Sequence, residues 1–202
     1  MKKTAFLSVI LVLIISVFPI GASAAEAHTV VRGDTMWKIA VKYEVGLSEI
    51  INANPHINNP ALIYPGQIIN IPSLESEVLA YEKEVVRLVN IERTKNGLAP
   101  LTQDWELCRI ARYKSQDMRD RNYFSHTSPT YGSPFQMMNS FGISYRTACE
   151  NIAKGYKTPA AVVDGWMNSS GHRANILNSS FTHIGVGYVT DGHYWTQMFI
   201  SK

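Results

Sequence analysis

The chain has 202 residues, of which 46% are hydrophobic and 17% are charged, a balance typical of folded proteins and unlike that of disordered chains. This length allows one domain or two small ones. The formal net charge of +3 includes Lys2 and Lys3, which we expect to be removed, so the mature chain lies near +1 and its charge gives no support for nucleic-acid binding.

The N-terminal segment has the features of a secretory signal peptide. Lys2 and Lys3 precede an apolar run over residues 5–20, and Ala22-Ser23-Ala24 then offers small residues for cleavage. The alternative is a retained membrane anchor, which the shortness of the apolar run disfavours. The sequence therefore predicts a signal peptide at residues 1–24, no stable membrane span after its cleavage, and a protein that works outside the membrane.

Residues 28–72 are expected to form a small separate unit. A β run at residues 29–31 leads into a turn at residues 32–35, and apolar residues from Met36 to Tyr43 then recur at helical spacing. A second helix is expected around residues 47–51, and a strand at residues 68–72 closes the unit. The pattern predicts the order β–α–α–β.

Three segments of this unit, at residues 30–40, 52–55 and 64–72, resemble a LysM module. The resemblance implies binding of N-acetylglucosamine-containing glycans, chiefly peptidoglycan, in a groove between two loops. Backbone amides there can bond an N-acetyl group while apolar side chains cover its methyl. The expected contact residues are Gly33, Asp34, Thr35, Met36, Pro60, Ile63 and Tyr64. Core packing is the alternative role for Ile63 and Tyr64, and Trp37 is expected in the core.

A short polar linker is expected at residues 73–80, followed by a second domain at residues 81–202. A helix is predicted from about Tyr81 to Asn96, and Thr102 is the expected cap of the next helix. Ser133-Pro134 and Thr158-Pro159 each combine an N-cap residue with proline at the first helical position. Alternating residues near the C-terminus predict two strands joined by a hairpin turn, at residues 184–189 and 194–200.

Three residues of this domain can do chemistry near neutral pH: His126, Glu150 and His172. If the fold brings them together, the imidazoles and the carboxylate can bind a transition metal such as Zn²⁺ or shuttle a proton. The alternative is that each is an ordinary solvated side chain on a surface loop.

The motifs around these residues resemble the CAP superfamily, which includes plant pathogenesis-related proteins and venom antigens. They occur in the family's order, at residues 123–126, 150–153, 165–167, 171–173, 183–187 and 194–197. The resemblance implies an α–β–α sandwich with a cleft that holds two histidines and two acids. His126, Glu150 and His172 match three of these four, as tentative catalytic or metal-binding residues. Ser169 stands where the second acid is expected, which puts a full four-residue metal site in doubt.

The two cysteines, Cys108 and Cys149, leave two readings open. An even count in an exported protein permits a disulfide, and the alternative is two separate buried thiols. A catalytic role for Cys149 is disfavoured because the surrounding residues resemble no thiol-protease signature.

The predicted fold class is α+β, with a small βααβ LysM module followed by an α–β–α sandwich. The pairing resembles secreted proteins of endospore-forming bacteria, whose relatives are described as spore coat assembly or germination-related. It implies a secreted protein of the cell wall or spore envelope that binds peptidoglycan through LysM and presents the His–Glu–His cleft to a ligand or to other envelope proteins. The alternative function is a metal-assisted hydrolase of wall peptide or glycan, so whether the chain is an enzyme stays open.

Overall fold

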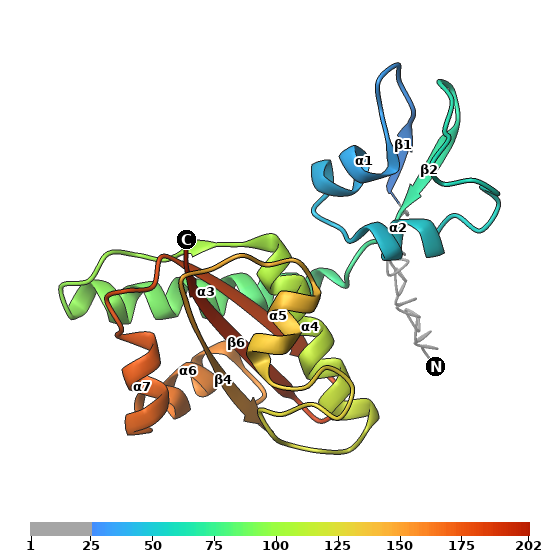
Figure 1. Cartoon of the computed structure of the whole chain (residues 1–202). Coiled ribbons are helices and arrows are strands. Elements are labelled where there is room, and N and C mark those ends of the chain that lie inside the picture. The colour runs from blue at the N-terminus through green and yellow to red at the C-terminus, as the bar shows by residue number, and fades with distance from the viewer. Residues whose placement is uncertain (1–25) are drawn as a thin grey trace, which may run out of the picture.

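The computed structural model describes residues 26–202, so the predicted signal peptide at residues 1–24 lies outside the described part of the chain. A small N-terminal unit and a larger C-terminal unit are visible in Figure 1. Within residues 26–202, no helix combines the length and the hydrophobicity that crossing a lipid bilayer requires.

The N-terminal unit has the predicted βααβ order. Its elements are β1 (Glu26–Thr29), α1 (Met36–Lys42), α2 (Leu47–Asn52) and β2 (Ile68–Ile71), with β1 antiparallel to β2. Thr35 begins α1 by accepting a hydrogen bond from the amide of Lys38, which is the expected N-cap contact. Both helices share a hydrophobic core with β2 that includes Ile39, Ile50 and Ile69.

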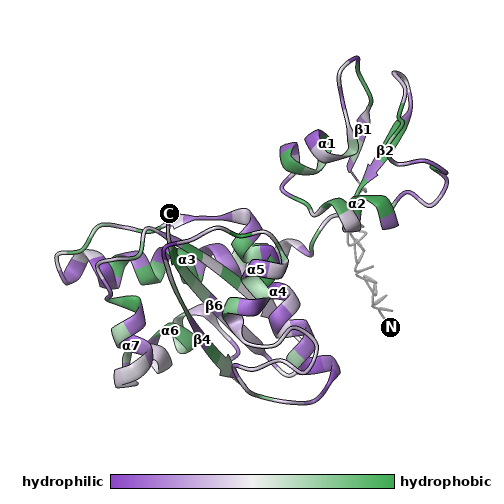
Figure 2. Cartoon of the chain, in the orientation of Figure 1, coloured by the Kyte–Doolittle hydropathy of each residue, from purple (hydrophilic) through white to green (hydrophobic). Residues whose placement is uncertain are grey.

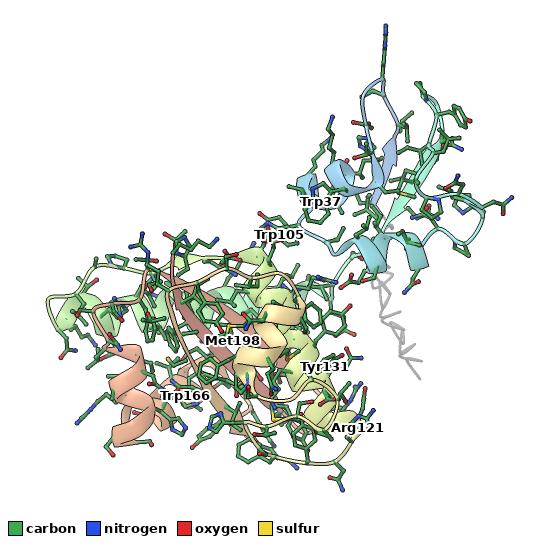
Figure 3. All side chains as sticks on the ribbon, in the orientation of Figure 1. Trp37, Trp105, Arg121, Tyr131, Trp166 and Met198 are labelled. Carbon is green, nitrogen blue, oxygen red and sulfur yellow. The ribbon has the colours of Figure 1, made fainter. Side chains whose placement is uncertain are left out.

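Trp37 does not belong to this core. Its side chain is 51% exposed on α1, so the expectation of a buried Trp37 is wrong. Figure 3 labels Trp37 among the side chains drawn on the ribbon. Met36, Ile39 and Ala40 form the buried stripe at helical spacing, and the residue after Met36 points about 100° away from that stripe. The position of Trp37 in the helical repeat, and not the size of its indole, therefore decides that the side chain is exposed.

The C-terminal unit is built around a sheet in the order β3-β5-β6-β4. The strands are β3 (Thr102–Gln103), β4 (Thr147–Lys154), β5 (His183–Val189) and β6 (Tyr194–Ser201). The helices are α3 (Ser76–Lys95), α4 (Trp105–Asp120), α5 (Pro134–Ser140), α6 (Pro159–Met167) and α7 (Ser170–Ile176). Strand β4 lies at one edge of this sheet.

Helices cover both faces of the sheet, which gives the predicted α–β–α sandwich. On one face, residues of α3, α6 and α7 pack on the sheet around Trp166 and Trp195. On the other face, α4 and α5 pack around Leu107 and Met198. Hydrophobic and hydrophilic residues mix along the outer helices in Figure 2, as amphipathic helices require.

Helix α4 lies unusually close to β5. A Cβ built on Gly187 would lie 2.1 Å from the carbonyl carbon of Ala111, and one on Gly185 would lie 2.3 Å from that of Leu107. Any larger residue at either position would push the helix backbone away from the sheet. The two glycines of the segment at residues 183–187 therefore fix the distance between the helix layer and the sheet.

Helix starts follow the predicted caps, with two differences. Ser133 forms a full capping box with Gln136, and Thr158 caps α6. Asp104, not Thr102, caps α4, because Thr102 pairs with β5 as part of β3. Helix α3 begins at Ser76 instead of Tyr81, so it takes up most of the stretch expected as a linker.

The two units touch through charged side chains. Glu49 on α2 accepts hydrogen bonds from the Arg109 guanidinium on α4, with N–O distances of 2.6 and 2.9 Å. The Tyr113 hydroxyl donates to the same carboxylate, and Arg109 also donates to the Ser48 hydroxyl at 3.1 Å. We call this group of interactions the Glu49–Arg109 contact. It joins the two units in addition to the peptide chain that connects them.

Candidate functional site

The structure places His126 directly against Glu150. His126 lies in the loop between α4 and α5, and its Nδ1 is 2.8 Å from Oε1 of Glu150 on β4. The His126 side chain is 53% exposed, whereas that of Glu150 is 1% exposed. A buried carboxylate therefore orients an imidazole whose other nitrogen, Nε2, remains for contact with a ligand.

Burial is the main influence on the Glu150 carboxylate. It raises the pKa of Glu150, while the hydrogen bond from His126 and the charge of Lys114 oppose that rise. Its second oxygen, Oε2, is buried and has no hydrogen-bond partner within residues 26–202. A buried carboxylate oxygen without a hydrogen-bond partner is energetically unfavourable.

His172 lies near this pair, across the edge strand. Burial lowers the pKa of His172, and the charge of His126 lowers it further. The carbonyl of His172 accepts a hydrogen bond from the Asn151 amide, and Asn151 also accepts one from Asn175. A buried asparagine on β4 therefore fixes the position of α7 and of His172. His172 itself lies on the short helix α7.

The loop that carries His126 is held by two residues of α4 that the sequence analysis did not single out. The Lys114 ammonium donates to the carbonyls of Ser125 and His126 at 2.7 and 2.9 Å. Asp117 accepts hydrogen bonds from the hydroxyls of Tyr123, Ser128 and Thr130. A lysine within the apolar stripe of α4 is the sequence signal that marks this arrangement.

The three candidate residues do not form a ready metal cage. Among residues 26–202, no group of three or more His, Cys, Asp or Glu side chains is arranged to hold a metal ion. Oε1 of Glu150 faces Nδ1 of His126 instead of a shared coordination point. Ser169, at the expected position of the second acid, is the N-cap residue of α7 and supplies no carboxylate. This arrangement does not fit a three-ligand Zn²⁺ site, and the metal assignment stays a prediction.

Cys108 and Cys149 are both free thiols, so the disulfide reading is wrong for this structure. Cys149 on β4 packs into the core beneath α3 and α6. Cys108 belongs to α4 on the opposite face, and its sulfur accepts a hydrogen bond from the amide of Val186 on β5. Because the sheet itself separates the two sulfurs, bridging them would require the core to open.

The expected glycan contacts of the N-terminal unit divide into framework and surface residues. Met36 is buried, Thr35 caps α1, and Asp34 bonds to His28 at 2.8 Å. Gly33 has a φ of +91° and its carbonyl accepts a hydrogen bond from Lys38. These residues shape the first loop, and their side chains are engaged within the protein. The backbone of Gly33 is the part of this loop that remains for a ligand.

The second loop supplies the exposed apolar surface. Tyr64 is 56% exposed and Leu62, which the sequence analysis did not name, is 51% exposed, whereas Ile63 packs against the core and Pro60 is partly buried. Hydrogen bonds of Val30 with Gly66 and Gln67 hold the two loops together. In Figure 1 both loop tips lie at the end of the unit that points away from the C-terminal unit.

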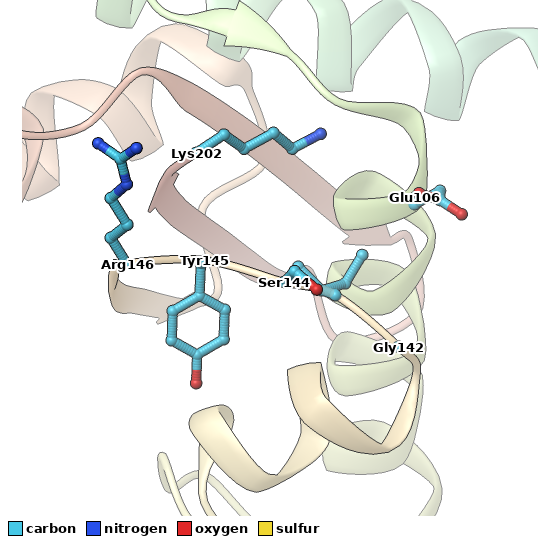
Figure 4. A pocket seen from close by; sticks show the side chains of 7 residues that line it. Glu106, Gly142, Ser144, Tyr145, Arg146 and Lys202 are labelled. Carbon is cyan, nitrogen blue, oxygen red and sulfur yellow. The ribbon is translucent and has the colours of Figure 1, made fainter.

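A separate hollow of about 530 Å³ lies beside the start of β4 and the end of β6. Its lining includes Glu106, Tyr145, Arg146 and Lys202, and none of the three candidate residues. In Figure 4 the charged side chains at its rim point in different directions. We therefore assign the candidate site to the His126–Glu150 pair and not to this hollow.

Comparisons with known proteins agree with both units. The family described as "Cysteine-rich secretory protein family", abbreviated CAP, matches residues 86–200, and the LysM domain matches residues 28–72. The uncharacterized protein YkwD of Bacillus subtilis (strain 168) is 68% identical over 130 residues, which are 64% of this chain and 51% of that protein. SpoIVD-associated factor A of the same strain is 48% identical over 48 residues, 24% of this chain and 12% of its own length.

A solved structure supports the fold of the C-terminal unit. An extracellular protein containing an SCP domain from Bacillus anthracis str. Ames superposes with a TM-score of 0.60 at 35% identity, over 68% of this chain and 47% of that one. The chain thus spans about half the length of these Bacillus relatives or less. The family model matches residues 86–200, and this part of the chain has the α–β–α layers described above. The chain therefore belongs to the CAP, or cysteine-rich secretory protein, family and carries a LysM domain ahead of the CAP domain.

Proposed function

We propose that this chain is an exported, non-enzymatic protein of the cell wall or spore envelope. Its LysM domain binds N-acetylglucosamine-containing peptidoglycan, and its CAP domain presents His126, Glu150 and His172 to a wall component or to another envelope protein. The observation that carries the proposal is the LysM domain with exposed Leu62 and Tyr64 on its second loop. These side chains are placed to cover the methyl of an N-acetyl group beside the backbone of the first loop.

The arrangement of the units supports this division of labour. The loops at the tip of the LysM domain point away from the CAP domain, so wall polymer bound there leaves the CAP domain uncovered. A role in spore coat assembly or germination is part of the proposal. It draws support from relatives named SpoIVD-associated factor A and Spore coat assembly protein ExsA, each 48% identical over 48 residues.

The test is sedimentation of the mature full-length protein with insoluble peptidoglycan. Tyr64→Ala and Leu62→Ala should each weaken binding, and together they should abolish it. Phe135→Ala is the matched control, because Phe135 is a similarly exposed aromatic residue on α5 of the CAP domain. Binding that survives the double substitution would assign wall recognition to another surface.

A second candidate function is hydrolysis of wall peptide or glycan, and the pairing of His126 with the buried Glu150 favours it. A carboxylate on Nδ1 orients an imidazole so that Nε2 can take a proton from an attacking water or give one to a leaving group. Purified wall incubated with the wild type and with His126→Ala distinguishes the two functions. Release of soluble fragments by the wild type alone would replace the binding role of the CAP domain with a catalytic one.

A further inference from the structure

We propose that Lys114 is a positioning residue for His126: its buried ammonium holds the backbone of the His126 loop so that the imidazole meets Glu150. The inference rests on the proposed function only in treating His126 as the residue that faces a ligand. The geometry of the loop is independent of what that ligand is.

Lys114 occupies a position where the pattern of α4 calls for an apolar side chain. It lies four residues after Ile110 and four before Met118, both fully buried on the face of α4 that packs toward the sheet. Lys114 itself is 1% exposed. Burying an ammonium is unfavourable unless it is paired and hydrogen-bonded, so an aliphatic residue would serve the core better.

The ammonium makes all of its hydrogen bonds to the loop. Its Nζ lies 2.7 Å from the carbonyl oxygen of Ser125, 2.9 Å from that of His126 and 3.1 Å from the hydroxyl of Tyr123. These contacts use the three donors of a lysine. Two consecutive carbonyls bound to one buried cation fix the backbone on both sides of the His126 Cα.

This anchor matters because little else restrains the ring. More than half of the His126 side chain is exposed, and the bond from Nδ1 to Glu150 is the contact that orients it within the described residues. Asp117 holds the following part of the loop through Ser128 and Thr130, but it does not touch His126. Lys114 therefore fixes the backbone position of His126, and Glu150 fixes the orientation of its imidazole ring.

The test follows the Nδ1–H proton of His126 by NMR in full-length protein labelled with ¹⁵N-histidine. A proton held by Glu150 should give a downfield signal that exchanges slowly with water, and Glu150→Gln, which should lose it, assigns the signal. Lys114→Met keeps the aliphatic stem and removes the ammonium. We expect it to speed the exchange by about tenfold or more, because the charge-assisted hydrogen bonds that hold the loop are lost. Lys114→Gln retains amide donors and should restore part of the protection.

Lys154→Met is the control, since Lys154 is an exposed lysine on the same strand as Glu150 and lies over the Tyr194 ring. It should leave the signal unchanged. A folded Lys114→Met protein with wild-type exchange at His126 would overturn the proposal. Unfolding of both Lys114 variants would also overturn it, because Lys114 would then serve the core as a whole. Failure of the CAP domain to bind any wall component or any other envelope protein would contradict the proposed function and leave the NMR result untouched.

Discussion

Glu49 of the LysM domain and Arg109 of the CAP domain form a two-point ion pair, with N–O distances of 2.6 and 2.9 Å. Their side chains are only 29% and 20% exposed, and Tyr113 donates a further hydrogen bond to the carboxylate. Partly buried, bidentate arginine–carboxylate pairs are stronger and more directional than exposed ones. The Glu49–Arg109 contact therefore restrains the orientation of the LysM domain relative to the CAP domain.

Arg109→Ala should let the two domains tumble separately, because it removes both hydrogen bonds to Glu49. The measurement is ¹⁵N relaxation, in which the LysM residues should acquire a shorter correlation time than the CAP residues. Arg87→Ala is the control, since Arg87 pairs with Glu84 within α3 on the exposed surface. If the LysM residues of Arg109→Ala keep the wild-type correlation time, the short chain connection alone couples the domains.

The same contact should weaken in acid. Burial favours a raised pKa for Glu49, but hydrogen bonds from Arg109, Tyr113 and Ser48 outweigh it and lower the pKa to about 2. A carboxylate with a lowered pKa in the docked state stabilises docking above its ordinary pKa and loses that contribution as the pH falls toward the lowered value. Between pH 6 and pH 3 we expect a loss of about 1 kcal/mol, allowing for screening by solvent. Relaxation data at both pH values check this, and Glu49→Gln should remove the pH dependence.

Both cysteines should behave as unreactive thiols. Burial is the main reason why the pKa of Cys108 rises to about 11 and that of Cys149 to about 12, so neither is a thiolate near neutral pH. A thiol reagent should find no reactive group in the native protein and two groups after denaturation. The melting temperature should be the same with and without reductant, and a drop on reduction would reveal a disulfide.

Asn151→Ala should detach α7 from the sheet edge. Asn151 is fully buried and bonds to the carbonyl of His172 and to the side chains of Gln197 and Asn175. Its truncation leaves buried partners unsatisfied, and we expect a loss of about 2–3 kcal/mol in the free energy of unfolding. Asn96→Ala is the control because the Asn96 amide also bonds to a backbone carbonyl, that of Glu92, but at the surface. Urea denaturation measures both, and equal losses would contradict the role given to Asn151.

The elements of this chain are largely local in origin, and so they follow from sequence. Ser133 and Thr158 begin helices where the capping residue and the following proline predict them. The hairpin β5–β6 follows from alternation. Thr102 shows the limit, because its pairing with β5 is a tertiary contact that no local pattern contains. Trp37 shows another, because its residue type favours burial whereas the helical periodicity of α1 places it on the exposed face.

The candidate site depends on tertiary structure more than the helices and strands do. The residue types of His126 and Glu150 suggest chemistry, but their 2.8 Å contact depends on the loop that Lys114 and Asp117 fix to α4. For the cysteines, parity alone suggested a bridge, whereas the sheet places Cys108 and Cys149 on opposite faces. Which face of a sheet a residue occupies follows from strand register, and register is set by the whole fold.

Zinc should bind the CAP domain weakly and through imidazole. Nδ1 of His126 is engaged by Glu150, which leaves Nε2 as the ligand nitrogen, and His172 is the nearby second imidazole. Two protein ligands fall short of the three or four of typical zinc sites, and Ser169 adds no carboxylate. Titration calorimetry of the full chain with zinc chloride should show binding that His126→Ala and His172→Ala each abolish.

In the same titration, Glu150→Gln should weaken zinc binding by about tenfold or more, as expected when a carboxylate that orients a histidine ligand is removed. His183→Ala should bind zinc like the wild type, because His183 begins β5 and bonds to its neighbour Thr182. Zinc binding that persists unchanged in both His126→Ala and His172→Ala would place the metal elsewhere on the chain. The His126–Glu150 contact would then serve ligand recognition or proton transfer alone, since it needs no metal to orient the ring.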